Sequence, residues 1–267
     1  MPELPDVELY RRTLEAHALH QKIVHVAVGD RRILGDLAEK DFCARLGGNR
    51  LERARRHGKH LLVKLARDGW LVMHFGMTGN LEYVEPAGKD VPYGRVRLDF
   101  ENGSLAYVNR RMLGRVGLAD DADAFVAAEG LGPDALDPSF DLAKLSSALD
   151  GRREVKAVLM DQGVVAGIGN LYADEILFQA RLHPKTPGRN LGDAKRKSLF
   201  ETIKQVLQTA IDCGAGAEQF LERLPKGWLL PQRHEGGICP RCRSKLATLK
   251  AAGRTSYHCP RCQPEPA

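Results

Sequence analysis

Long apolar runs, internal repeats and low-complexity tracts are all missing from this chain of 267 residues. A helix that crosses a membrane needs about 20 consecutive, mostly apolar residues, so the sequence predicts none. The N-terminal residues also lack the apolar stretch of a secretory signal, because Glu3, Asp6, Glu8, Arg11 and Arg12 interrupt them. We therefore expect a protein of the cytoplasm. A hydrophobic share of 43% is enough to bury one large core or two modest ones.

Excess charge is also lacking from most of the chain. The net charge is +6, and the whole excess lies in residues 233–262, where seven lysines and arginines face a single acid, Glu235. A localised basic segment indicates a polyanionic partner, most often nucleic acid. The alternative interpretation, a solvated basic tail, requires that nothing organises the segment.

The basic segment contains four of the six cysteines, spaced C-x2-C-x16-C-x2-C. This spacing is typical of a closed tetrahedral zinc site, with two thiolate ligands from each of two tight turns. Two disulfides are the alternative, but no secretory signal places the chain in an oxidising compartment. We therefore predict one structural Zn²⁺, bound by Cys239, Cys242, Cys259 and Cys262.

The first half of the chain favours an N-terminal β-sandwich with a packed helix, in an α+β protein. Residues 5–20 place apolar side chains on one helical face, and the following hundred residues read mainly as strands. The expected strands are 23–28, 60–66, 70–77, 96–100 and 104–108. The acidic stretch 119–140, with one glycine pair and two prolines, reads as the connection between domains.

The second half favours helices followed by a hairpin. Helical periodicity predicts helices over 140–149, 154–161, 170–180 and 193–211, and the zinc segment predicts a β-hairpin with Gly253 and Arg254 at its tip. We place the domains at 1–120, 138–228 and 229–267, with a linker at 121–137. Cys43 and Cys213 stand alone and are expected to be ordinary buried thiols.

A glycine-rich turn lies between two of these helices. Gly163, Gly167 and Gly169 precede Asn170, which starts a predicted helix. Exposed backbone N–H groups at a helix N-terminus form a ready phosphate site. A tight turn between packed helices is an equally good interpretation of the glycines alone.

The N-terminal "MPELP" also has two interpretations. Pro5 suits the first turn of a helix, where its missing N–H would be unpaired in any case. If Met1 is removed, Pro2 carries a free secondary amine, a nucleophile that can form a cationic iminium with a carbonyl-level carbon. Many chains have proline at position 2 without a chemical reason, so this signal needs support from elsewhere.

Several motifs together provide that support. "PELPDVE" at 2–8, "GKHLL" at 58–62, "HFGMTG" at 74–79, "VKAVLMDQGVVAGIGNLYADE" at 155–175 and "GRTSYHCPRCQ" at 253–263 occur in this order. The sequence thereby resembles the formamidopyrimidine-DNA glycosylase/endonuclease VIII family of base-excision repair enzymes, nearly end to end. The resemblance implies a monomer that binds double-stranded DNA with oxidised bases or abasic sites, through a helix–two-turn–helix element and a zinc finger.

The resemblance also implies the catalytic residues. Pro2 is the matching nucleophile: its nitrogen attacks C1′ of the damaged nucleotide, the base leaves, and the iminium promotes elimination of the 3′ and then the 5′ phosphate. An α-amino group with a pKa of about 8 supplies some neutral amine at neutral pH. Glu3 matches the residue that transfers protons during ring opening, and Lys59 matches the lysine that holds a phosphate beside the lesion.

Three residues match the family's wedge, which fills the gap left by an everted base. Met77 matches the intercalating methionine, and Arg111 matches the arginine of a D-x-R-x-F-G pattern. Two positions depart from that pattern: Leu113 stands where phenylalanine is expected, and Asn109 replaces the aspartate. Leucine can still act as a wedge but cannot stack as an aromatic ring does.

Further matches concern the DNA backbone and the choice of lesion. Asn170 and Arg254 match the family's phosphate clamp, and Lys156 matches a lysine that approaches the oxidised-purine pocket. These features favour the branch that removes formamidopyrimidine and 8-oxoguanine. Residues 221–239 depart from that branch, so an endonuclease VIII-like enzyme for oxidised pyrimidines is the alternative. A binding protein without catalysis is a second alternative, which intact Pro2, Glu3 and Lys59 disfavour.

Overall fold

The computed structural model describes residues 1–266. By its internal contacts the chain forms two compact units. Unit 1 contains Met1–Pro2 and Asp6–Glu129, and unit 2 contains Glu3–Pro5 and the chain from Gly130 onward. Among the described residues, no helix combines the length and the apolar character that a membrane crossing requires.

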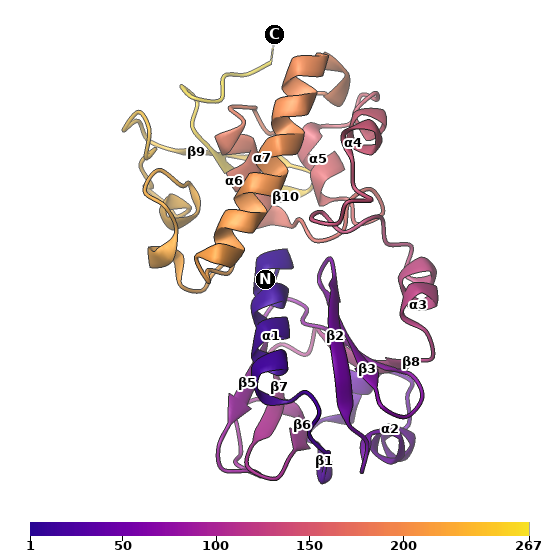
Figure 1. Cartoon of the computed structure of the whole chain (residues 1–267). Helices are drawn as coiled ribbons and strands as arrows, with labels where there is room; N and C mark the ends of the chain where they lie inside the picture. The colour runs from indigo at the N-terminus through magenta and orange to yellow at the C-terminus, as the bar shows by residue number, and fades with distance from the viewer. Residues whose placement is uncertain (267) are drawn as a thin grey trace. The chain divides into compact units, whose positions relative to one another are not determined.

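Unit 1 is built on two antiparallel sheets of four strands, so the predicted β-sandwich is confirmed (Figure 1). One sheet has the order β1-β6-β7-β5, and the other has the order β2-β3-β4-β8. The strands are β1 (His25–Val28), β2 (Leu51–His57), β3 (His60–Leu65), β4 (Trp70–His74), β5 (Gly79–Val84), β6 (Gly94–Asp99), β7 (Ser104–Asn109) and β8 (Arg115–Ala119).

Helix α1 (Leu4–His17) contributes Val7, Tyr10 and Leu14 to the core of unit 1, as the helical pattern predicts. It ends three residues earlier than expected, and Leu19 instead bridges to Leu51, the first residue of β2. The strands β2, β5 and β8 were not predicted, nor were three short helical elements: the 3-10 turn η1 (Arg31–Leu34) and the helices α2 (Glu39–Leu46) and α3 (Ala122–Ala128). Helix α3 lies within the stretch that the sequence favoured as a connection.

Unit 2 contains the four predicted helices. They are α4 (Leu142–Ala148), α5 (Val155–Met160), α6 (Asn170–Gln179) and α7 (Asp193–Asp212), the long orange helix in Figure 1. Every third or fourth residue of α7 is buried, so its apolar stripe forms one wall of the core. One 3-10 turn, η2 (Gly188–Asn190), lies before α7, and two more, η3 (Leu221–Arg223) and η4 (Leu230–Gln232), follow it.

The C-terminal hairpin consists of β9 (Ala247–Ala251) and β10 (Arg254–His258). Its two turn residues are Ala252 and Gly253, with φ of 50° and 69°. Two successive positive φ values are the mark of a type I′ turn, which suits the twist of a two-residue hairpin. Arg254 is therefore the first residue of β10 rather than part of the turn itself.

The two solitary cysteines are half-buried rather than fully buried. Cys43 packs against the core of unit 1, and Cys213 packs against the core of unit 2. Both behave as small hydrophobic side chains at the edge of a core.

Candidate nucleic-acid interface

Lys59 lies on the two-residue turn between β2 and β3, where His57 pairs with His60. Gly58, the first turn residue, has φ of 56°, a value that glycine adopts without steric cost and that tight hairpin turns require. The turn therefore presents Lys59 at the end of a rigid hairpin, with its side chain partly exposed.

Two loops of unit 1 hold the predicted wedge residues, and hydrogen bonds join them. The loop after β4 carries Met77, and the loop after β7 carries Arg111 and Leu113. The Arg111 N–H donates to the Thr78 hydroxyl at 3.2 Å. Gly76, with φ of 61°, approaches the Leu113 carbonyl so closely that a Cβ would overlap it. The structure thus brings together all three residues.

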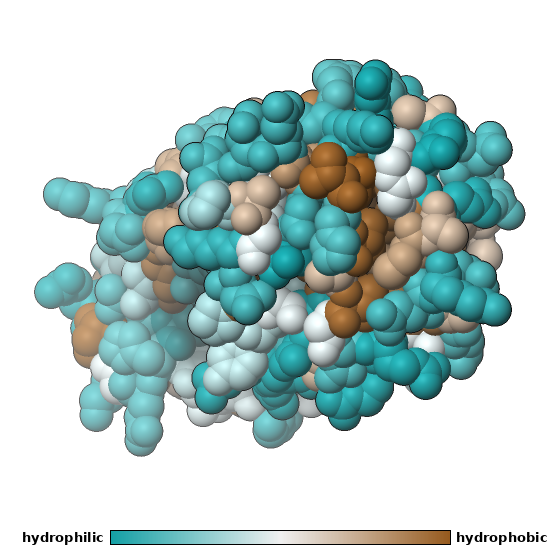
Figure 2. Space-filling model, turned by 90° about the horizontal axis from the view of Figure 1, so that it is seen from below, coloured by the Kyte–Doolittle hydropathy of each residue, from teal (hydrophilic) through white to brown (hydrophobic). Residues whose placement is uncertain are grey.

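Exposure singles out the same loops. Met77 is 38% exposed and Leu113 is 51% exposed, although most large hydrophobic residues of the chain are buried. The face drawn in Figure 2 is likewise mostly hydrophilic, with its hydrophobic side chains confined to small patches. Exposed apolar residues on adjacent, hydrogen-bonded loops are what insertion into a base stack requires.

Asn109 is the departure from the family pattern that the structure explains. Its side chain is fully buried, and its Nδ2 donates to the Phe75 carbonyl and contacts the Tyr107 hydroxyl, both at 3.1 Å. An aspartate carboxylate could not donate to that carbonyl. Asn109 therefore ties the loop after β7 to the loop after β4 without burying a charge.

Tyr93 is a residue that the sequence reasoning missed. Its ring is 51% exposed, and the guanidinium groups of Arg95 and Arg110 lie 5.9 and 5.6 Å from the ring centroid. Its carbonyl accepts the Asn109 N–H at 3.0 Å, so it adjoins the wedge loops. An exposed aromatic ring beside cationic groups suits stacking on a nucleobase. No local motif marks it, because Arg95 lies in β6 and Arg110 lies in the loop after β7.

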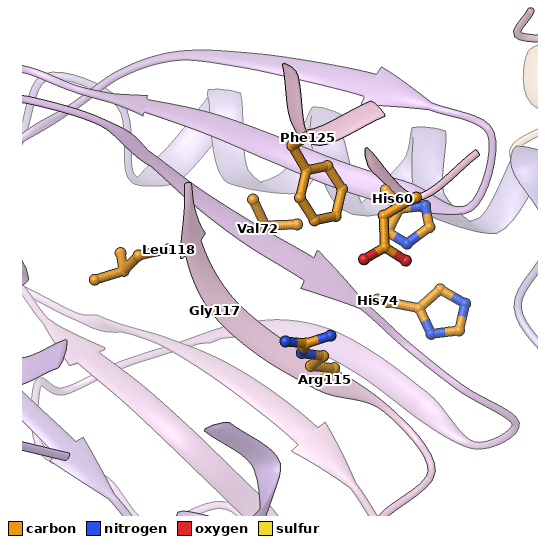
Figure 3. Close-up of a pocket in the computed structure, with 8 residues that line it drawn as sticks. His60, Val72, His74, Arg115, Gly117, Leu118 and Phe125 are labelled. Atoms are coloured by element: carbon orange, nitrogen blue, oxygen red, sulfur yellow. The ribbon is translucent and has the colours of Figure 1, made fainter. Parts of the chain in front are cut away.

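A cavity of about 230 Å³ lies on the sheet that contains β3, β4 and β8. Figure 3 shows the rings of His60, His74 and Phe125 along it, with Arg115 nearby. Burial, reinforced by repulsion from His74 and Lys59, lowers the pKa of His60 to about 3, and burial also lowers the pKa of His74. Both histidines are therefore neutral at neutral pH and leave Arg115 as the cation of this cavity.

In unit 2, the Glu3 carboxylate caps helix α6. Its oxygens accept the backbone N–H groups of Gly169, Leu171 and Tyr172 at 2.6, 2.9 and 3.2 Å. Glu3 is fully buried, and a Cβ on Gly169 would lie 2.5 Å from its carboxylate. Because a carboxylate from the same unit already accepts these three N–H groups, the tight-turn interpretation of the glycines is favoured over a backbone phosphate site.

Asn170 and Lys156 occupy different environments. Asn170, the first residue of α6, is partly exposed, and its Nδ2 donates to the Thr255 carbonyl of β10 at 3.2 Å. Lys156 is fully buried and forms an ion pair with Asp174 at 2.7 Å. Because it is buried, the Lys156 ammonium is not placed to contact a base directly. Asp174, which the sequence reasoning missed, lies one turn after Asn170 on the same face of α6.

Arg254 is exposed at the start of β10, directly after the turn. Asn170 contacts the next residue of that strand, Thr255. The structure therefore places the two predicted clamp residues at neighbouring positions of unit 2, one on a helix N-terminus and one on a hairpin.

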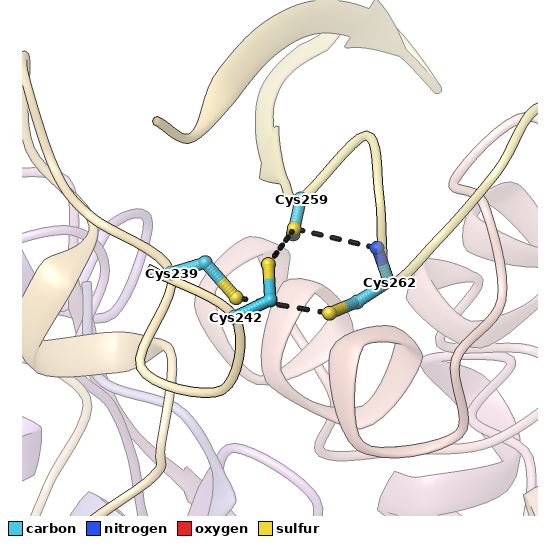
Figure 4. Close-up of side chains that lie close together, drawn as sticks. All are labelled: Cys239, Cys242, Cys259 and Cys262. Atoms are coloured by element: carbon cyan, nitrogen blue, oxygen red, sulfur yellow. Dashed lines mark hydrogen bonds between the residues drawn. The ribbon is translucent and has the colours of Figure 1, made fainter. Parts of the chain in front are cut away.

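The four predicted zinc ligands converge. Their sulfur atoms all lie within 4.8 Å of one another, and Figure 4 shows them turned toward one another. The Cys239–Cys262 and Cys242–Cys259 sulfur separations are 3.8 and 3.4 Å. A tetrahedral site with Zn–S bonds of about 2.3 Å has sulfur separations of about 3.8 Å. The cluster therefore fits one structural Zn²⁺, and four thiolates leave no open coordination position.

Comparison with known families matches three successive regions of the chain. Residues 1–116 match the formamidopyrimidine-DNA glycosylase N-terminal domain, and residues 131–221 match the H2TH domain of the same enzyme. Residues 238–264 match a zinc finger found in FPG and IleRS.

Whole-length relatives agree with these matches. The chain is 35% identical to the formamidopyrimidine-DNA glycosylase of Stutzerimonas stutzeri, over 98% of this chain and 100% of that protein. It is 36% identical to the Moorella thermoacetica protein of the same name, over 98% and 92%.

Solved structures give the same result. The fold is similar to that of Lactococcus lactis Fpg (MutM) in complex with DNA containing N7-benzyl-Fapy-dG, with a TM-score of 0.89, 28% identity and coverage of 99% and 100%. A complex of the L. lactis enzyme with abasic-site DNA gives a TM-score of 0.88 at 28% identity, with coverage of 98% and 100%. Sequence, domains and fold agree, and the chain belongs to the formamidopyrimidine-DNA glycosylase family.

Proposed function

We propose that this protein is a bifunctional DNA glycosylase and abasic-site lyase of base-excision repair that removes oxidised purines, formamidopyrimidine and 8-oxoguanine, from double-stranded DNA. The observation that carries the proposal is the buried Glu3 carboxylate, which three backbone N–H groups of α6 hold directly after Pro2 in the chain. Besides capping α6, a carboxylate fixed in this way lies next in the chain to a potential terminal amine, where it can transfer protons.

Pro2 is the proposed nucleophile once Met1 has been removed. The lone pair of its nitrogen forms a bond to C1′ as the glycosidic bond breaks, and the electron pair of that bond leaves with the base. Loss of the nitrogen proton and opening of the sugar ring give an iminium between Pro2 and C1′. The iminium draws electrons from C2′, so a base can remove a C2′ proton and the 3′ phosphate leaves by β-elimination. A second elimination then releases the 5′ phosphate.

Glu3 and Lys59 serve this sequence in different ways. Glu3 moves protons during base loss and ring opening, a role that general acid–base catalysis makes worth about 10²–10⁴-fold in rate. Lys59, at the end of the β2–β3 hairpin, holds a phosphate beside the lesion with its ammonium group.

The remaining residues bind and distort the duplex. Met77, Arg111 and Leu113 occupy the gap left by the everted nucleotide, and eversion costs a few kcal/mol of unstacking that this wedge offsets. Asn170 and Arg254 hold backbone phosphates. Zinc, bound by the four clustered cysteines, supplies a structural crosslink that keeps the hairpin folded.

Oxidised purines are favoured as substrates by two features. The helix–two-turn–helix stretch 155–175 resembles the purine branch of the family, and the relatives with matching length are named for formamidopyrimidine. The solved structures similar to this chain include one bound to DNA with a Fapy-dG lesion.

Borohydride trapping tests the chemistry and the substrate together. The purified protein is incubated with duplexes that contain 8-oxoguanine, formamidopyrimidine, thymine glycol or an abasic site, then reduced, and the adducts are mapped by mass spectrometry. We expect a chain that begins at Pro2 and a sugar remnant on the Pro2 nitrogen, formed with both purine lesions and the abasic site. Trapping only with thymine glycol would assign the oxidised-pyrimidine specificity instead. Binding without any adduct would indicate a non-catalytic protein.

A further inference from the structure

Lys156 is the most deeply buried cation of unit 2, and its ammonium group has three partners. It donates to the Asn170 Oδ1 and the Asp174 Oδ1, both at 2.7 Å, and to the Ser256 hydroxyl. Three acceptors match the three protons of an ammonium group. Burial lowers the pKa of Lys156, while the neighbouring Asp174 charge opposes that shift and favours the cation.

The contact with Asn170 fixes the direction of its side-chain amide. The carbonyl oxygen faces Lys156, so the NH₂ group must face the other way, where one N–H donates to the Thr255 carbonyl. The second N–H has no partner among residues 1–266. If the amide were flipped, its NH₂ would face an ammonium group that cannot accept a hydrogen bond. Lys156 thus selects the rotamer that offers an N–H to an acceptor.

Asp174 and Arg233 extend the hydrogen bonds around Lys156 to the C-terminal hairpin. Asp174 Oδ2 accepts from Arg233 Nε at 2.8 Å and from the Tyr257 backbone N–H at 3.0 Å. Arg233 also donates to the Thr255 carbonyl at 3.1 Å. The Asp174–Arg233 ion pair therefore holds two backbone groups of β10, within three residues of Arg254 in that strand.

We propose that Lys156, Asp174 and Arg233 form a positioning network that sets the Asn170 amide and the first residues of β10 for a DNA backbone phosphate. The proposal rests on the proposed function, since it assigns the free Asn170 N–H and Arg254 to the same ligand. Lys156 then acts through Asn170 and never touches DNA.

A double-mutant cycle tests this role. Lys156→Met, Asn170→Ala and the double variant are compared for affinity to a duplex with a tetrahydrofuran abasic-site analogue, which needs no chemistry. We expect Lys156→Met and Asn170→Ala each to weaken binding about tenfold, and the double variant to be no weaker than Asn170→Ala. Additive losses would overturn the proposal. Lys204→Met is the matched control, because the Lys204 ammonium contacts the Asp137 carbonyl instead of Asn170, and it should bind as the wild type does.

A second variant and a second measurement cover the case in which Lys156→Met does not fold. Arg233→Gln removes a partly exposed member of the network, and its loss of affinity should be smaller in the Asn170→Ala background, where only its contact with the Thr255 carbonyl remains to be lost. An undiminished loss in that background would overturn the proposal. Hydrogen exchange of the Asn170 side-chain amide, followed by NMR in the protein without DNA, gives a second test that does not depend on catalysis. The side-chain NH₂ of Asn170 should show one slowly and one rapidly exchanging proton, and that difference should disappear in Lys156→Met or Arg233→Gln. Unchanged exchange in the variants would overturn the network, whereas a wild type that fails to bind the duplex would refute the proposed function alone.

Discussion

The Glu3 carboxylate accepts the Gly169 backbone N–H at 2.6 Å, a hydrogen bond that joins residues 166 positions apart in the chain. The next residue, Leu4, donates its own N–H to the Gly167 carbonyl at 3.0 Å. Gly167, with φ of 116°, leaves no room for a Cβ beside the Leu4 side chain. Gly167 and Gly169 therefore make room for the N-terminal residues Leu4 and Glu3.

The fit between Gly169 and Glu3 predicts a severe effect of one added methyl group. In Gly169→Ala the new Cβ would lie 2.5 Å from the Glu3 carboxyl carbon, so the carboxylate must move. Base excision from 8-oxoguanine duplexes should fall about 100-fold, in the range of lost acid–base catalysis. Gly192→Ala is the matched control, because Gly192 also precedes a helix but has no atom within 4 Å of a Cβ. Equal activity of the two variants in single-turnover assays would contradict this prediction.

Glu3→Gln separates the two proposed chemical steps. Glutamine keeps the size of the side chain but cannot take up a proton as a carboxylate does. Base removal from an intact lesion should therefore fall far more than cleavage of a ready-made abasic site, where the base has already gone. Single-turnover rates on the two duplexes give the comparison. A uniform loss on both would assign Glu3 to general positioning of the N-terminus.

The exposed wedge residues predict a difference between substrates. Met77→Ala should slow excision of an intact lesion, because an unfilled gap no longer offsets the cost of unstacking. Affinity for an abasic-site analogue should change much less, since no base has to be everted. Leu113→Phe should alter the rate on intact lesions and leave abasic cleavage nearly unchanged. Parallel losses on both substrates would argue against a wedge at these positions.

Some parts of the fold could be predicted because local patterns determine them. Helix α7 has an apolar stripe at helical spacing, and the paired cysteines have the spacing of a metal site. Strand β2 could not be found in this way. Its sequence "LERARRH" buries only Leu51, Ala54 and His57, and its many charged residues mask the strand pattern.

The candidate site shows the same division. The cysteine cluster was predictable because four thiolates at fixed spacing leave few alternatives. The network around Lys156 was not predictable. Asp174 and Ser256 lie 18 and 100 positions from Lys156, and Arg233 lies 59 positions from its partner Asp174, so only folding brings these residues together. A motif indicates which residue types are present, but contact over such separations depends on the tertiary structure.

The partly buried His60 in unit 1 predicts a dependence of stability on pH. Burial lowers the pKa of His60 to about 3, whereas an unfolded histidine titrates near 6.5. Between these values the unfolded state binds the proton more readily, so stability is fully present above about pH 6.5 and falls as the pH drops. His60→Phe should lessen the fall in the free energy of unfolding between pH 6.5 and 4.5. His20→Asn, at an exposed position with φ of 63° that asparagine tolerates, should leave it unchanged.

Loss of zinc should disable the C-terminal hairpin and spare unit 1. Cys242→Ser removes one of four thiolates, so the protein should contain less than one equivalent of zinc by atomic emission and should bind duplex DNA at least tenfold more weakly. The reason is that the cluster holds the two cysteine turns that flank β9 and β10, and with them Arg254. Unit 1 has its own core and no cysteine of this cluster, so its near-ultraviolet circular dichroism from Trp70 should persist.

Cys213→Ser, which alters a thiol outside the cluster, is the control and should keep both zinc and affinity. Full duplex binding by a zinc-free protein would show that the hairpin does not depend on the metal.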